Sequence, residues 1–439
     1  MNLPAAKTNA MILCADIGTS SLKAALVDTN GKLAAFSRKA YAGAAPGCWL
    51  AAFFEALEGI ASQCLVRAGA VVISGNGPTL VPVLADGTSA APLYWFSAPE
   101  TGTAGSGPSD GPSFFLPNVL ACKNRDPERF KKTKLFLSSQ EWLSFSLGAD
   151  PVTVLPQEAY SPFYWDGAQC REAGLDTGIF PPFVPMGSRI GGIRRNGTGA
   201  SCRAACQAIL PEGTPILAGG PDFIMALLGS AVVEPGMICD RAGSSEGINL
   251  CIDRAAFDRI NVAAGTGIRL LPHARKGFFN AGVIIGESGS LFEKYRRDSG
   301  QADKPYEVLM EEISADGSHP ARAVLDRMAF QVKAALEKLR AAGLVPASPD
   351  PVQMVVSGGQ AKSPLWNAIK AKKTGAVLVA PEIPDGELAG NAVLGALYLE
   401  AVRGRADTGP DSPPGAFPEP ERLREYAQRM VRIKDRYEP

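Results

Sequence analysis

Short apolar runs near the N-terminus have the length and composition of β-strands. They occupy residues 11–15, 22–27 and 33–37, and polar residues separate them. Residues 28–31 join the second run to the third and contain an Asn-Gly pair, which accepts the positive φ angles of a tight hairpin turn. We therefore predict that the fold begins with a strand followed by a β-hairpin.

Longer segments carry apolar residues at three- and four-residue spacing, which predicts amphipathic helices. The clearest are residues 49–68 and 320–342. The other predicted elements are helices at 141–147, 223–228 and 390–402, and buried strands at 71–74, 214–218 and 352–356. Because strands alternate with helices in both halves, we expect an α/β architecture.

The chain is too long for a single hydrophobic core. It has 439 residues, of which 46% are hydrophobic and 20% charged, close to globular averages. We predict an N-terminal domain at 1–229 and a C-terminal domain at 230–439. The stretch 97–113 is packed with Gly, Pro, Ser and Thr, and we expect it to form a surface loop.

The charge balance argues against nucleic acid or a membrane as a partner. Lys plus Arg and Asp plus Glu both number 44, so the chain has no net charge that would attract it to nucleic acid or to an anionic membrane. The longest apolar runs fall short of the ~20 residues of a membrane span and of a signal peptide. We expect a cytoplasmic protein, and the sequence leaves a homodimer open.

Cysteine and histidine patterns support neither a disulfide framework nor a metal centre. The nine cysteines are an odd number scattered through the chain, which is typical of reduced, buried thiols. Cys202 and Cys206 are helically spaced, but no second pair or histidine completes a zinc site. His273 and His319 lie outside any motif, and the chain contains no P-loop run of the Gly-x-x-x-x-Gly-Lys-Ser/Thr type.

Two parts of the chain correspond at a spacing of 225 positions. The shift places Gly18-Thr19-Ser20 over residues 243–245 and residues 26–28 over 251–253. Each half thus contains a glycine-hydroxyl turn that leads into a strand, which predicts that the two domains begin alike.

An Asp-x-Gly-Thr-Ser turn between two strands has the chemistry of a phosphate site. Its backbone N–H groups and two hydroxyls surround one concavity, which suits a phosphate. Asp16 adds a carboxylate, the ligand type that Mg²⁺ prefers. Two such turns facing each other would hold a triphosphate between the domains. On these residues alone, a plain hairpin turn is an equally good interpretation.

These segments resemble a known family. The segment CADIGTSSLKAALVD is similar to the first phosphate motif of the FGGY carbohydrate kinase family, which belongs to the superfamily of sugar kinases, actin and chaperone ATPases. Further similar segments follow in the family's order: VVISGNGPTLVPVLADG from Val71, YWF from Tyr94, ILAGGPDFIMALLG from Ile216, AGSSEG from Ala242 and VVSGGQAKSPLWNAIKAKKTG from Val355. The resemblance spans residues 11–402.

The resemblance implies a fold and a set of site residues. The fold would be two actin-like (ribonuclease H-like) α/β domains with mixed sheets, flanking helices and a cleft between them. ATP and Mg²⁺ would be the cofactors, and a small sugar or polyol, most similar to a pentulose such as xylulose, would be the substrate. The implied residues are Asp16 for the metal; Gly18, Thr19, Ser20, Gly243, Ser244, Ser245, Gly358 and Gly359 for the nucleotide; Asn76 and Trp95 for the sugar; and Asp222 for catalysis and sugar contact.

Asp222 corresponds to the family's catalytic base at the end of Gly219-Gly220-Pro221-Asp222. A carboxylate close to the acceptor hydroxyl can orient it and accept its proton during phosphoryl transfer. Helix N-capping is the alternative role for this residue. For Asn76 and Trp95 the alternatives are an ordinary turn and a core position.

The chain departs from the family pattern in two places. Residues 95–99 read Trp-Phe-Ser-Ala-Pro where members commonly have Trp-x-Asp-x-Arg, and residues 291–320 are shorter than the family's ATP-enclosing segment. Two alternatives therefore stay open: a non-catalytic sugar or nucleotide sensor, and a superfamily ATPase without a sugar acceptor. Retention of both Asp16 and Asp222 favours the kinase.

Overall fold

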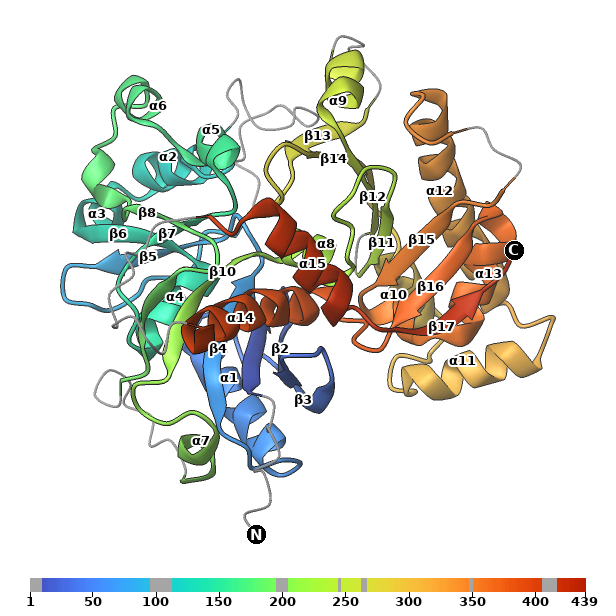
Figure 1. Cartoon of the computed structure of the whole chain (residues 1–439), viewed down its shortest axis with the longest axis horizontal. Helices are drawn as coiled ribbons and strands as arrows, with labels where there is room; N and C mark the ends of the chain where they lie inside the picture. Colours follow the sequence, from blue (N-terminus) through green and yellow to red (C-terminus); the bar gives the residue numbers. More distant parts are fainter. Residues whose placement is uncertain are drawn as a thin grey trace. The chain divides into compact units, whose positions relative to one another are not determined.

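The computed structural model divides the chain into two compact units (Figure 1). It describes residues 10–94, 113–194, 204–243, 246–261, 267–346, 350–404 and 417–439. Unit 1 comprises residues 1–225 and 390–426, and unit 2 comprises 226–389 and 427–439. The first division lies close to the predicted boundary at 229, but residues 390–426 pack with unit 1, whereas the sequence analysis placed them in the C-terminal domain.

A mixed sheet forms the centre of unit 1, with strand order β3-β2-β1-β4-β10-β9. The pairs β1–β2, β2–β3 and β10–β9 are antiparallel, whereas β1–β4 and β4–β10 are parallel. The strands are β1 (Met11–Ile17), β2 (Ser21–Asp28), β3 (Leu33–Ala40), β4 (Ala68–Gly75), β9 (Arg189–Gly192) and β10 (Pro215–Pro221). The described parts of this sheet confirm the predicted opening of strand and hairpin.

The interior strands of this sheet are apolar on both faces. Every residue of β1 is buried, and β4 is buried at all positions but one. Strands with parallel neighbours are covered on both sides, so they read as continuous apolar runs rather than alternating ones. The β2–β3 turn contains Gly31 at φ +82°, the conformation that the Asn-Gly pair predicted.

Helices from distant parts of the sequence cover this sheet. The helix α1 (Pro46–Ala61) begins with a proline at its first position and buries Trp49, Phe53 and Leu57. The capped helix α4 (Ser139–Leu147) contacts β4 and β10. In α14 (Gly386–Gly404), Gly395 lets the helix approach Ile12 of β1 so closely that a Cβ atom would lie 2.5 Å from its Cγ2.

Smaller elements complete unit 1. They are β5 (Leu80–Leu84) paired with β6 (Thr133–Ser138), β7 (Thr153–Leu155) paired with β8 (Phe183–Pro185), α2 (Leu116–Arg125), α3 (Pro127–Lys132), α5 (Ser161–Tyr164), α6 (Gly167–Glu172), α7 (Ala204–Ile209) and two 3₁₀ turns, η1 (Glu158–Tyr160) and η2 (Thr177–Ile179). Of the predicted surface loop at 97–113, only Ser113 lies within the described residues.

A second mixed sheet forms the centre of unit 2, with strand order β13-β14-β12-β11-β15-β16-β17. Its middle five strands repeat the order and directions of β3-β2-β1-β4-β10. The strands are β11 (Ile238–Ala242), β12 (Glu246–Ile252), β13 (Arg269–Pro272), β14 (Phe279–Ile285), β15 (Gln353–Ser357), β16 (Val377–Pro381) and β17 (Ile433–Tyr437). The correspondence at 225 positions is confirmed, because it places β1 and β2 on β11 and β12.

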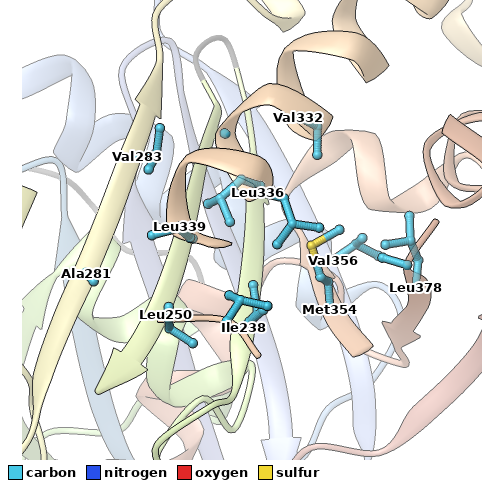
Figure 2. Close-up of a cluster of buried hydrophobic side chains, with 14 of the residues drawn as sticks. Ile238, Leu250, Ala281, Val283, Val332, Leu336, Leu339, Met354, Val356 and Leu378 are labelled. Carbon is cyan, nitrogen blue, oxygen red and sulfur yellow. The ribbon is translucent and has the colours of Figure 1, made fainter. Parts of the chain in front are cut away.

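The core of unit 2 lies between this sheet and α12 (Ala321–Ala341). Figure 2 shows Val332, Leu336 and Leu339 of α12 directed toward strand residues that include Val356 and Ile238. These helix positions are spaced by three or four residues, as the periodicity predicted. The other helices of unit 2 are α9 (Arg254–Asn261), α10 (Gly289–Asp298), α11 (Tyr306–Ala315), α13 (Pro364–Thr374) and the 3₁₀ turn η3 (Gly359–Lys362). The helices α8 (Asp222–Gly229) and α15 (Pro420–Met430) each contain residues of both units.

Candidate active site

Three predicted site residues of unit 1 lie at the carboxyl ends of adjacent parallel strands. Asp16 is the penultimate residue of β1, Asn76 follows β4, and Asp222 follows β10. The register aligns these ends, since Ile17 and Pro221 both pair with Gly75. In open α/β sheets this edge is where ligands bind.

Asp16 is a buried carboxylate held by hydrogen bonding. Its Oδ1 accepts from Ser74 Oγ at 2.8 Å, and Ser74 Oγ in turn accepts from Asn391 Nδ2 at 2.9 Å. Lys23 is its direct cross-strand partner, with Nζ 3.9 Å from Asp16 Oδ2. The lysine therefore places a positive charge beside the carboxylate at the entrance to the first turn.

Hydrogen bonds close the first glycine turn. The N–H of Gly18 donates to Ser21 O at 3.1 Å, and Tyr41 donates to the carbonyls of Gly18 and Ser20. Thr19 and Ser20 are exposed, and no hydrogen bond within the described residues uses their N–H groups. Exposed turn residues with unused donors are compatible with a phosphate ligand.

Asp222 is the first residue of α8 and is half-buried. Its Oδ1 accepts a hydrogen bond of 2.6 Å from the N–H of Phe223. The carboxylate thus interacts with the start of the helix, as the capping alternative expects. A helix N-terminus also favours the charged form of a carboxylate, which is the form that a general base requires.

Asn76 is a buried polar side chain without a hydrogen-bond partner among the described residues. It is 3% exposed, and both its Oδ1 and its Nδ2 are unpaired, as is Oγ1 of the nearby Thr79. Buried polar atoms are almost always hydrogen-bonded, so this unsatisfied group fits a polar ligand such as a sugar hydroxyl. Asn76 is also fixed by its backbone, which donates to Ile17 O at 2.9 Å.

The sequence analysis did not predict three polar residues of this region. Gln140 of α4 packs beside the backbone before Asn76, since a Cβ on Gly75 would lie 2.9 Å from its Oε1. Lys23 and Asn391 contact Asp16 and Ser74. Two signals in the sequence could have identified Lys23 and Asn391. Lys23 is a lysine within an apolar strand, and Asn391 is an asparagine within an alanine-rich helix.

In unit 2, the turn after β11 and the loop after β15 come together. Gly358 has φ +93°, and a Cβ on it would overlap the backbone of Ala242, the residue before Gly243. Among the described residues, no atom within 4 Å would meet a Cβ on Gly359. These contacts bring Gly358 and Gly243 to the same strand edge and leave open space at Gly359.

Not every predicted residue can be placed. Trp95, Ser244 and Ser245 lie outside the described residues. Of the others, Asp16, Gly18, Thr19, Ser20, Asn76 and Asp222 gather at the strand edge of unit 1, and Gly243, Gly358 and Gly359 at that of unit 2.

The residues present fit a magnesium nucleotide. The exposed N–H groups of Thr19 and Ser20 suit phosphate, and Asp16 supplies one buried carboxylate. Mg²⁺ in phosphoryl-transfer sites is commonly held by one or two carboxylates together with substrate phosphates and waters. In unit 2, considered by itself, the described residues leave space at Gly359 for a ligand to approach the backbone.

Comparison with known proteins gives one family. The C-terminal domain model of the FGGY family of carbohydrate kinases matches residues 310–399. Xylulose kinase of Bacillus subtilis (strain 168) is 24% identical across 87% of each chain. L-fuculokinase of Escherichia coli (strain K12) is 24% identical over 278 residues, which cover 56% of this chain and 54% of the relative.

Solved structures share the fold. The ligand-bound xylulose kinase of Lactobacillus acidophilus superposes with a TM-score of 0.69 at 16% identity, covering 98% of this chain and 94% of that one. Glycerol kinase of Plasmodium falciparum with ADP gives a TM-score of 0.71 at 15% identity, with the same coverage. Among the described residues, no helix has the length and apolarity needed to cross a membrane.

Proposed function

Because this chain belongs to the FGGY family of carbohydrate kinases, we propose that it transfers the γ-phosphoryl group of ATP to a hydroxyl of a small sugar or polyol. The observation that carries the proposal is the alignment of Asp16, Asn76 and Asp222 at the ends of three adjacent parallel strands. One edge thus holds two carboxylates and an unsatisfied amide, which supports the proposed roles in metal binding, acceptor binding and proton removal.

Asp222 is the proposed general base. Its carboxylate orients the acceptor hydroxyl and takes its proton as the oxygen bonds to phosphorus. The hydrogen bond from Phe223 N–H fixes one carboxylate oxygen, so the group is held in place before substrate binds. Capping and base catalysis are compatible, since both use the ionised carboxylate.

The proposed phosphate contacts are the turn of Gly18, Thr19 and Ser20 in unit 1, and Gly243 in unit 2. Asp16 would hold Mg²⁺, which when bound neutralises charge on the phosphates. Lys23 is positioned to add a second positive charge near the same turn. Gly358 and Gly359 would accept the nucleoside, because backbone without side chains allows close approach.

The proposed substrate is a neutral sugar or polyol similar to a pentulose. Support comes from the name of the relative aligned over most of the chain, a xylulose kinase, and from the unsatisfied side chain of Asn76. An amide offers one acceptor and two donor hydrogens, which suits neighbouring hydroxyls that both donate and accept. Gln140 lies beside the same segment and is a further candidate contact.

A coupled ADP-release screen tests the proposal. The purified protein is assayed with Mg²⁺ and ATP against ketoses, aldoses and polyols, with a no-sugar reaction as the control. We expect ADP release that depends on at least one acceptor. Release without any acceptor would indicate an ATPase, and nucleotide binding without release across the whole panel would indicate a sensor; either result contradicts the proposed activity.

A further inference from the structure

A buried group of three charged residues lies beneath the second glycine turn. Lys370 of α13 places its Nζ 2.5 Å from Asp240 Oδ2 of β11 and 2.6 Å from Glu246 Oε1 of β12. All three side chains are almost fully excluded from solvent. Neither the nucleotide contacts nor the acceptor site described above uses this lysine.

A hydrogen-bond chain connects these charges to the turn. Ser288 Oγ donates to Glu246 Oε2 at 2.5 Å, and Gln360 Nε2 donates to Ser288 Oγ at 3.0 Å. Gln360 Nε2 also contacts the carbonyl oxygen of Gly243 at 3.2 Å. Its Oε1 accepts from the indole N–H of Trp366, which holds the amide in one orientation.

The network contacts the two strands that lie before and after Gly243. Asp240 lies two residues before the end of β11, and Glu246 is the first residue of β12. Ala242 pairs with Glu246 in the register, so the network holds the described residues on both sides of the turn. The chain thus places three ionisable side chains in contact within the core of unit 2.

The positive charge of Lys370 compensates the two buried carboxyl groups of Asp240 and Glu246. Burial, and next the nearby Glu246, raise the pKa of Asp240 well above its usual range. Although burial opposes it, the Lys370 ammonium lowers the pKa of Glu246. Replacing the lysine with a neutral side chain would leave two carboxylates facing each other in the core, and one would have to protonate or move.

We propose that Lys370 is a positioning residue for nucleotide binding: with Asp240, Glu246, Ser288 and Gln360 it holds Gly243 and the strand ends on either side of it in the positions that phosphate binding requires. This inference rests on the proposed function only in taking that turn as a phosphate site. Buried ion networks contribute little net stability compared with apolar packing, and fixing one geometry is a role they can serve instead.

The test is direct nucleotide titration of the full-length protein. Calorimetry with Mg²⁺ and ATP, and separately ADP, is run on wild type and on Lys370→Met, with Lys372→Met as the matched control. Lys372 lies on the same helix and is exposed. We expect the Kd for ATP to rise at least about tenfold in Lys370→Met and to stay unchanged in Lys372→Met, because small displacements of a positioning element weaken binding strongly.

Kinetics separate positioning from general destabilisation. In Lys370→Met the KM for ATP should rise while the KM for the sugar at saturating ATP stays near wild type. A second variant, Gln360→Met, leaves the three charges in place and removes the contact to Gly243 O. It should raise the Kd for ATP, and as long as the variant is folded at the titration temperature it decides the question if Lys370→Met does not fold; its Tm should fall, because the bonds to Ser288 and Trp366 are lost as well.

Three outcomes would overturn the inference. They are an unchanged Kd for ATP in folded Lys370→Met, an unchanged Kd in Gln360→Met, or no nucleotide binding by the wild type. The proposed activity can fail separately, since a wild type that binds ATP but phosphorylates no sugar still permits every Kd comparison.

Discussion

The carboxylates Asp16 and Asp222 are expected to serve different roles because their surroundings differ. Asp16 is buried, accepts a hydrogen bond from Ser74 Oγ and faces Lys23 across the strand pair. Asp222 is half-buried at the start of a helix. A shielded carboxylate suits a metal, and an accessible one can receive a proton.

Two substitutions of Asp222 separate catalysis from helix capping. Asp222→Ala removes both roles, whereas Asp222→Asn keeps a good capping oxygen and loses the base. We expect both variants to lower kcat by at least about a hundredfold. Asp222→Asn should retain the wild-type Tm in a thermal melt. Sugar phosphorylation near the wild-type rate in Asp222→Asn would reject the role of general base.

His273 makes the stability of unit 2 depend on pH. Its Nε2–H donates to Val232 O and its Nδ1 accepts from the N–H of Arg275, so the neutral ring uses both nitrogens. Burial, the largest influence, lowers the pKa of His273 to about 4. The unfolded chain binds the proton near the usual pKa of about 6.5.

This contribution to stability is therefore complete above about pH 6.5 and is lost progressively as the pH falls toward 4. Urea unfolding of wild type and His273→Gln checks it. The advantage of wild type over the variant should shrink between about pH 7 and pH 5. His319→Gln is the control, and an equal pH trend in all three proteins would contradict the assignment.

The observed ends of a helix can differ from those that its apolar periodicity predicts, because single residues at the ends favour or stop the helix. The helix predicted at 49–68 is observed as Pro46–Ala61. It begins earlier because proline is favoured at a first helical position, where no N–H is needed. It ends earlier because Gln63 donates from its side chain to Phe36 O and Gly59 O, and Leu65 beyond it is 66% exposed.

Two adjacent glycines of the loop after β15 should respond differently to alanine. Gly358 has φ +93° and no space for a Cβ, whereas Gly359 has open space there. We expect Gly358→Ala to lower the free energy of unfolding by more than about 1 kcal/mol and Gly359→Ala to change it little. Chemical denaturation measures both, and equal stability of the two variants would show that the loop tolerates a side chain at Gly358.

At the scale of the whole molecule, one strand topology is used twice. The strands β3-β2-β1-β4-β10 of one sheet and β14-β12-β11-β15-β16 of the other follow the same order and directions, and each sheet has a glycine between its first two strands in chain order. The repeat explains why similar short motifs occur 225 positions apart. Gly18 and Gly243 both lie at the carboxyl edge of their sheet, the edge where open α/β sheets bind ligands.

The discontinuous unit 1 makes a prediction about fragments. Residues 1–229 alone lack the part of α14 that contacts Ile12, Ser74 and the carbonyl of Ala15. We expect this fragment to lack cooperative thermal unfolding in circular dichroism, because its apolar strand face and polar groups are left uncovered. A chain that joins 1–225 to 390–426 by a short Gly/Ser linker should restore the transition, since Gly390 contacts Met225.

A stable, cooperatively unfolding fragment of 1–229 would contradict this division of the chain. The result would place the boundary where the sequence analysis predicted it. The fragment and the linked chain share all residues of 1–225, so the comparison isolates the contribution of α14.

Local patterns in the sequence determined the α/β class, the opening hairpin, the amphipathic helices and the glycine turns, because these features depend on periodicity and on backbone preferences of neighbouring residues. The resemblance of short motifs to the FGGY carbohydrate kinases, rather than periodicity, pointed to Asp16, Asn76 and Asp222 as site residues. Only the tertiary structure decided that α14 completes unit 1, that Lys23, Gln140 and Asn391 adjoin the site, and that Lys370 meets Asp240 and Glu246. These contacts join residues up to hundreds of positions apart, and their partners are chosen by packing and charge in three dimensions, which no local pattern contains.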